Sequence, residues 1–173
     1  MKCIECGGRM KTARENFRHE ALGLPVTLVG VEVSRCAGCG LSEVSIPQLE
    51  GLHRAIAAAL VSKTARLTAA EIRFLRKQLG WSGAELADHL GVTRETVSRW
   101  EQGSAPIGAT ADRLLRATVA LTTGISLTTA TLRKIGRDEP ASVALRLHHD
   151  SEGWKAGATP PRGAKRSRRA SAP

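Results

Sequence analysis

Four cysteines are the residues of this 173-residue chain whose spacing could bind a metal ion. They form two Cys-x-x-Cys pairs, Cys3 with Cys6 and Cys36 with Cys39, and a glycine follows each pair. Two intervening residues let a tight turn direct both sulfurs at one ion, and glycine lets the next backbone bend past the site without a Cβ clash. The sequence therefore predicts one structural Zn²⁺ held by four thiolates.

Three other uses of the cysteines remain open, but each fits the pattern less well. Two disulfides are disfavoured because the chain starts without an apolar signal core, so we expect it in the cytoplasm, where thiols stay reduced. A redox pair needs one Cys-x-x-Cys at a helix start inside a βαβ pattern, which the sequence lacks. An iron–sulfur cluster can use four cysteines, yet the symmetric spacing suits zinc better. A catalytic zinc is not expected, because four thiolates leave no coordination position for water.

The segment between the two cysteine pairs must bring the second pair back to the first. Residues 15–20 and 25–35 are predicted as strands, because β-branched residues alternate in the second and residues 22–25 supply a turn. Residues 1–62 carry 7 basic and 6 acidic side chains, so Zn²⁺ with four thiolates would make this module slightly acidic. We therefore expect it to contact a protein partner rather than DNA.

Basic side chains are in excess, with 26 Lys and Arg against 16 Asp and Glu and a formal net charge of +10. The excess favours nucleic acid as partner over an anionic membrane surface or a basic surface kept for solubility. It lies in residues 63–137, with 12 basic and 6 acidic side chains, and in residues 155–173, with 6 basic and no acidic ones. Aromatic residues make up only 3% of the chain, which disfavours a single-strand binder that stacks bases.

Helix starts and ends are legible in the middle of the chain. Apolar residues at every fourth position predict a helix over residues 49–61. Residues 68–71 and 82–85 each fit a capping box, in which a hydroxyl and a carboxylate satisfy free backbone N–H groups. The two helices that these boxes open are expected to end at Gly80 and Gly91.

A further helix is predicted from its Thr93 cap to a stop before Gly103. At 100° per residue Val97 and Trp100 share one face of it. The opposite face carries the polar side chains of Arg94, Glu95, Ser98 and Arg99. A short helix, a glycine turn and a helix with such a face predict a helix-turn-helix that reads the DNA major groove.

The polar face suggests how bases would be read. Arg94 and Arg99 can each present a planar donor fork to guanine, and Glu95 can accept from a cytosine amino group. Alternatively, Glu95 pairs with one of these arginines and holds its fork in place. Ser98 completes the predicted base-reading set. The candidates for phosphate contact are Ser82, Gly83, Thr93, Gln102, Ser104, Lys77 and Arg113.

Two more helices are predicted, over residues 109–121 and after a cap at Ser126, with Leu114, Leu115 and Val119 in the core. The expected fold is α+β. It comprises a zinc-bound β-hairpin module at 1–47, a linker helix at 48–66, an all-α helix-turn-helix domain at 67–137 and a polar, largely disordered tail at 138–173, basic at its end.

Residues 71–77, 82–87, 90–93 and 97–103 resemble the Xre/Cro family of DNA-binding domains, which have a lambda-repressor-like fold. With both cysteine pairs ahead of them, the order of parts over residues 1–122 is similar to that of MqsA-type antitoxins, also called YgiT-type zinc-finger regulators. The resemblance implies a homodimer joined through its C-terminal domain, a palindromic double-stranded DNA operator, and a zinc module that holds an mRNA-interferase toxin. Glu95 stands where those antitoxins carry Asn for base contact.

The predicted function is a sequence-specific DNA-binding repressor in the bacterial cytoplasm, associated with the nucleoid, that is also the antitoxin of a toxin–antitoxin pair. A stand-alone zinc-finger regulator with no toxin partner is the alternative. The sequence has no P-loop, Gly-x-Gly-x-x-Gly, His-Glu-x-x-His or nucleophile elbow, so we expect no catalytic residues. His148, His149 and Asp150 are interpreted as incidental surface residues.

Overall fold

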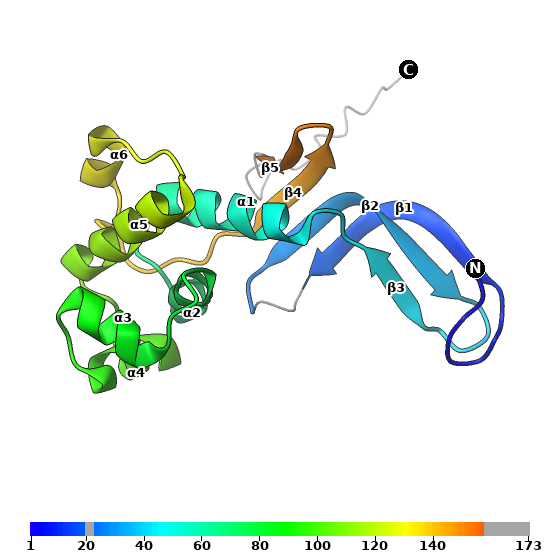
Figure 1. Ribbon diagram of the computed structural model, residues 1–173, viewed down its shortest axis with the longest axis horizontal. Helices are drawn as coiled ribbons and strands as arrows, with labels where there is room; N and C mark the ends of the chain where they lie inside the picture. The colour runs from blue at the N-terminus through cyan, green and yellow to red at the C-terminus, as the bar shows by residue number, and fades with distance from the viewer. Residues whose placement is uncertain (20–22, 158–173) are drawn as a thin grey trace, which may run out of the picture.

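The computed structural model describes residues 1–19 and 23–157, and it has a sheet and a helical module joined by a helix (Figure 1). Strands β1 (Met10–His19) and β2 (Val26–Cys36) form an antiparallel hairpin with the cysteine-bearing loops at its tip. Helix α1 (Leu49–Ser62) leads from the sheet to the helical module. The predicted α+β fold, a β-hairpin sheet with four cysteines ahead of a helical helix-turn-helix domain, is confirmed.

The hairpin is longer than the sequence pattern indicated. Strand β1 begins at Met10 rather than at residue 15, because it pairs with β2 as far as Cys36 and so carries both cysteine pairs to one end. Along β2, Val26, Leu28 and Val33 are no more than 1% exposed, as alternation in a sheet with one covered face requires. A short strand that was not predicted, β3 (Ser42–Ser45), pairs antiparallel with residues 32–35.

Two strands follow the helical module and complete the sheet. Strand β4 (Leu145–Asp150) runs parallel to β2, and β5 (Gly153–Gly157) pairs antiparallel with β4. The prediction of a largely disordered segment from residue 138 is therefore wrong for these strands. Their local sequence is polar, but Leu145, Leu147 and Trp154 are buried, and the pairing partner lies more than 100 residues earlier. The basic segment 158–173 lies outside the described residues.

Helix α1 is part of the core rather than a free tether. Its residues Leu52, Ile56 and Leu60, which recur at the spacing that predicted the helix, are at most 1% exposed. The helix packs against α5 and against β4 and β5. One continuous core therefore runs from β2 through α1 into the helical module.

The helical module contains α2 (Ala69–Gln78), α3 (Gly83–Leu90), α4 (Arg94–Gln102), α5 (Ala109–Thr123) and α6 (Thr129–Lys134). Both predicted capping boxes form, at Thr68 and at Ser82. Two details differ from prediction. Thr128 caps α6 instead of Ser126, because its hydroxyl accepts the Thr131 N–H. Leu114 is 43% exposed rather than in the core. No helix among the described residues is long and apolar enough to cross a membrane.

A buried ionic network, which the sequence did not reveal, ties the α1–α2 connection to α5. Arg116 and Asp112, one turn apart on α5, form an ion pair with both side chains 0% exposed. Arg116 also donates to the carbonyls of Leu60, Lys63 and Ala65. Beside it, Lys63 pairs with Glu71, and burial lowers the pKa of Lys63 although the carboxylate of Glu71 opposes this. These bonds fix the helical module against α1.

Candidate metal centre and nucleic-acid interface

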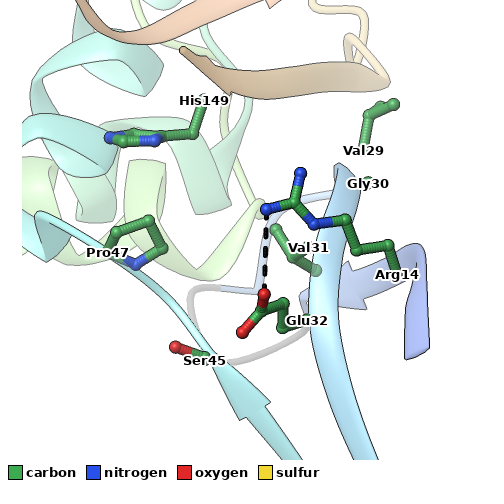
Figure 2. A pocket seen from close by; sticks show the side chains of 8 residues that line it. All are labelled: Arg14, Val29, Gly30, Val31, Glu32, Ser45, Pro47 and His149. Carbon is green, nitrogen blue, oxygen red and sulfur yellow. Dashed lines mark ion pairs between the residues drawn. The ribbon is translucent and has the colours of Figure 1, made fainter. Parts of the chain in front are cut away.

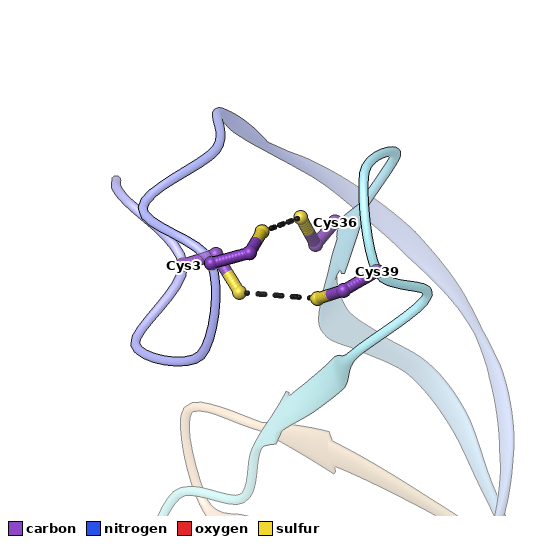
Figure 3. A group of neighbouring side chains, drawn as sticks. Cys3, Cys36 and Cys39 are labelled. Atoms are coloured by element: carbon purple, nitrogen blue, oxygen red, sulfur yellow. Dashed lines mark hydrogen bonds between the residues drawn. The ribbon is translucent and has the colours of Figure 1, made fainter.

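The two cysteine pairs meet at the tip of the hairpin (Figure 3). The Sγ atoms of Cys3 and Cys39 are 3.5 Å apart and those of Cys6 and Cys36 are 3.4 Å apart. All four sulfurs lie within 4.8 Å of one another. Cys3 and Cys36 are buried with Met10, while Cys6 and Cys39 are exposed. The structure thus brings together all four cysteines that the sequence singled out.

Two similar turns shape this cluster. Cys3 accepts a backbone hydrogen bond from Gly7, and Cys36 accepts one from Gly40. Gly7 and Gly40 have φ angles of 70° and 77°, a region that favours glycine. A Cβ atom on Gly8 would lie 3.3 Å from the Cys6 sulfur and 3.4 Å from the Cys36 sulfur, closer than ordinary contact. The backbone therefore leaves space around the sulfurs.

The geometry of the cluster fits a metal ion such as zinc. Tetrahedral coordination with Zn–S distances of about 2.3 Å places sulfurs about 3.8 Å apart, close to the observed separations. Hydrogen bonds from the backbone of Cys39 and Gly38 lower the pKa of Cys36 to about 6. This favours the thiolate, which is the form that binds metals.

The second candidate site is the pair of helices α3 and α4. Helix α3 ends at Gly91 with a φ of 64°, and Val92 donates back to the Ala87 carbonyl at 3.0 Å, which turns the chain sharply. Thr93 then caps α4 through a hydrogen bond from the Thr96 N–H. The capping residue and the glycine turn are those that the sequence indicated.

One face of α4 is in the core and the other is open. Val97 and Trp100 are 1% and 7% exposed, which confirms that Trp100 packs inward. The structure leaves the four predicted base-reading side chains exposed on α4: Arg94, Glu95, Ser98 and Arg99. The helix therefore offers a polar surface with two guanidinium groups to a partner.

Glu95 does not form an ion pair with either arginine within the part of the chain that the structure describes. Its own backbone N–H and the Thr93 hydroxyl bond its carboxylate and lower the pKa of Glu95, with smaller contributions from Arg94 and Arg99. The carboxylate is thus ionised and folded back on the helix start. Both guanidinium groups keep their donors available.

A partly buried ion pair, missed in the sequence, holds α4 against α2. Arg76 donates to both carboxylate oxygens of Glu101, at 2.6 and 3.1 Å, and also to the Trp81 carbonyl at 2.7 Å. Both side chains of the ion pair are only about 15% exposed. Arg76 was visible in the sequence only as one basic residue near the end of a helix, so its partner on another helix gave no local signal. This bidentate pair fixes the angle at which α4 meets α2.

The predicted phosphate contacts differ in what they already bond. The Ser82 N–H donates to Glu85, and the Ser104 hydroxyl donates to the Arg99 carbonyl. Gln102 donates to Ser98, and Arg113 donates to the Ile135 carbonyl at the end of α6, which draws its guanidinium toward α6. Lys77 is exposed, and Gly83 and Thr93 lie at the starts of α3 and α4.

Comparisons with known proteins bear on the helical module. A family model described as helix-turn-helix matches residues 72–118, which span α3 and α4 with most of α2 and α5. A search of curated proteins gives no match to the chain. The match and the cysteine cluster together fit a metal-binding, helix-turn-helix DNA-binding regulator.

Proposed function

We propose that the protein is a sequence-specific regulator of transcription, a repressor that reads double-stranded DNA with α4. The observation that carries this proposal is the open face of α4, with Arg94 and Arg99 exposed on a helix that a helix-turn-helix match includes. Each arginine fork pairs with guanine O6 and N7, and Glu95 accepts from a cytosine amino group. Each good pair contributes roughly 1–3 kcal/mol of discrimination.

Phosphate contacts position the helix in the groove. The backbone N–H groups at the starts of α3 and α4, near Gly83 and Thr93, point toward the partner with the positive ends of the helix dipoles. Lys77 adds a flexible charge, while Ser82, Gln102 and Ser104 offer weaker contacts. Arg113 is the least suited of the predicted set, because its Nε is bound to Ile135.

A homodimer on a palindromic operator is the expected assembly. Leu114 and Leu121 are 43% and 85% exposed on α5 and lie two helical turns apart, hence on one face. An apolar face of this kind fits a second copy of the chain. The substitution Leu121→Glu should shift the protein to monomer in analytical ultracentrifugation and weaken operator binding, whereas an unchanged dimer would exclude α5 from the interface.

The four cysteines hold one structural Zn²⁺ in this proposal. The ion would link the turn after Cys3 to the turn after Cys36, both of which are otherwise joined by few buried apolar contacts. A closed four-thiolate shell has no open position, so its contribution is to the fold of the tip.

The tip is the surface we assign to an mRNA-interferase toxin. In Figure 1 the cysteine-bearing loops and α4 lie at opposite ends of the molecule, so a protein on the tip would leave α4 clear. Met1 and Ile4 at the tip are 71% and 82% exposed, which suits a protein partner. The resemblance in the order of parts supports the antitoxin role, and a stand-alone regulator is the alternative.

The toxin proposal is tested on the full chain. Deleting residues 1–62 would remove Leu52, Ile56 and Leu60 from the core, so substitutions on the surface are the better probe. Co-expression with the small basic protein of a neighbouring gene should give a complex that Ile4→Asp disrupts without loss of operator binding. Leu49→Asp, at an exposed leucine of α1, is the matched control. Without such a complex, the stand-alone regulator is the better description.

The DNA-binding proposal is tested by selection of bound duplexes from a random pool, followed by footprinting. We expect an enriched palindrome and two protected patches about 34 Å apart on one side of the duplex. A pool that gains no sequence preference over repeated rounds would overturn the proposal.

A further inference from the structure

The outer edge of β2 is shared by two strands that leave a gap. Strand β3 pairs with residues 32–35 and β4 pairs with residues 26–29, so residues 30–31 have no strand partner on this edge within the described chain. Gly30 has a φ of 67° and donates its N–H to the Asn16 side chain at 3.2 Å. This local irregularity turns the backbone at the gap and leaves a hollow beside it.

A pocket of about 220 Å³ fills this gap (Figure 2). Its wall comes from β1, β2, β3, the β3–α1 connection and β4, and its lining residues are Arg14, Val29, Gly30, Val31, Glu32, Ser45, Pro47 and His149. A water molecule occupies about 30 Å³ in the liquid, so the pocket has room for a molecule of on the order of ten non-hydrogen atoms.

His149 carries an unsatisfied atom at this pocket. Its Nε2 is buried and has no hydrogen-bond partner, and no other side-chain nitrogen or oxygen among the described residues shares that condition. The ring is fixed on β4 by an edge-to-face contact with Trp154, with centroids 5.2 Å apart. Burial of an unpaired polar atom costs free energy, so this nitrogen calls for a partner that enters the pocket. The interpretation of His149 as an incidental surface residue is therefore wrong.

Arg14 supplies a charged group whose donors are largely unspent. Its guanidinium lies among the lining side chains in Figure 2, and its one ion pair there is a single 3.7 Å contact to Glu32. A well-formed pair between arginine and a carboxylate has two bonds of about 2.7–2.9 Å. Both side chains are more than half exposed, so a ligand carboxylate could replace Glu32 without breaking a buried bond.

We infer that this pocket is a binding site for a small monocarboxylate. The ligand carboxylate would take the Arg14 fork, and a second polar group of the ligand would bond His149 Nε2. Glu32 at the pocket disfavours a dianion such as phosphate or a dicarboxylate, because a second negative charge would face its carboxylate. Arg14 disfavours a simple cation.

The place of the pocket adds a consequence. Pro47 in its wall accepts a hydrogen bond from the Trp154 indole at 2.7 Å, and Gln48, which follows, caps α1 with a φ of 47°. A bound molecule would therefore contact the connection through which the sheet leads into α1. This site is separate from the cysteine cluster and from α4.

The test uses the full chain and ligand-observed NMR with acetate, isobutyrate, benzoate and 4-hydroxybenzoate, each beside its primary amide. We expect saturation transfer to at least one acid, a shift of the His149 imidazole nitrogens, and at least tenfold weaker binding of the matching amide. Arg14→Gln and His149→Phe should each weaken binding about tenfold. Lys11→Gln, at an exposed basic residue of the same strand, should leave it unchanged.

Three results would overturn the inference. No acid might bind at 10 mM, on the order of the weakest fragment affinities. The amides might bind as well as the acids, or the signal might persist in both pocket variants. Because Arg14 is 76% exposed, its variant should fold, and the backbone amide spectrum would verify this. A pocket that holds only water would give the first of these results.

Discussion

Arg116→Met is the substitution whose effect on stability follows most directly from the structure. The wild-type guanidinium is 0% exposed and donates to Asp112, to the Leu60 carbonyl at 3.0 Å and to the Ala65 carbonyl at 2.7 Å. Methionine fills much of the same apolar space but has no donor. The variant therefore leaves the Asp112 carboxylate buried without its charge partner, although one of its oxygens still accepts the Leu67 N–H at 2.8 Å.

Removal of one partner from a buried ion pair typically destabilises a protein by about 3–5 kcal/mol. A domain is commonly stable by about 5–15 kcal/mol, so the loss should be a large share of the whole. We expect urea unfolding, followed by far-UV circular dichroism, to show a free energy of unfolding lower by that amount. Arg133→Met, at an exposed position on α6, should change it by less than about 0.5 kcal/mol.

A double variant separates the buried charge from the lost packing. Asp112→Leu together with Arg116→Met should be more stable than Arg116→Met alone, because no unpaired charge is left in the core. A loss below about 1 kcal/mol for Arg116→Met would refute the reasoning, since the network would then contribute no more than an exposed pair does.

Three further predictions concern the metal centre, a helix cap and the sheet. The purified chain should contain one zinc ion per molecule by elemental analysis, and Cys39→Ser should reduce that content; a zinc-free chain with wild-type stability would exclude the site. Hydrogen bonds from Ser82 lower the pKa of Glu85 below its ordinary 4.5, so its cap stabilises the fold above that value and is lost as pH falls through the lowered pKa. Urea midpoints between pH 5 and pH 3 should then fall more steeply for wild type than for Glu85→Gln, and parallel curves would contradict this. Trp154→Phe removes the bond to Pro47 and should lower the free energy of unfolding by about 1–3 kcal/mol, with exchange protection lost first in β5; unchanged protection there would count against β4 and β5 as part of the sheet.

The features that the sequence predicted well are encoded locally. The spacing of Cys3 and Cys6 describes one turn, the pattern at Ser82 describes one helix start, and the face of α4 follows from 100° per residue. In each case the neighbours in sequence are also the neighbours in space. The roles of the α4 side chains in reading bases stay a prediction.

The features that the sequence missed depend on distant partners. Strand β4 is polar by composition and becomes a strand because Leu145 and Leu147 fill the core beside β2. The partner of Arg76 is on another helix, and the isolation of His149 Nε2 depends on how three strands surround it. Periodicity within a short window contains no information on such contacts.

The central claim is that α4 reads bases through Arg99, and a double-mutant cycle between Arg99 and the operator tests it most directly. Affinities of wild type and Arg99→Ala would be measured for the selected operator and for duplexes with one base pair changed at a time. The account predicts that Arg99→Ala loses roughly 1–3 kcal/mol of preference at one symmetric pair of positions, while its salt-sensitive nonspecific binding persists. Equal preference at every position for both proteins would contradict it.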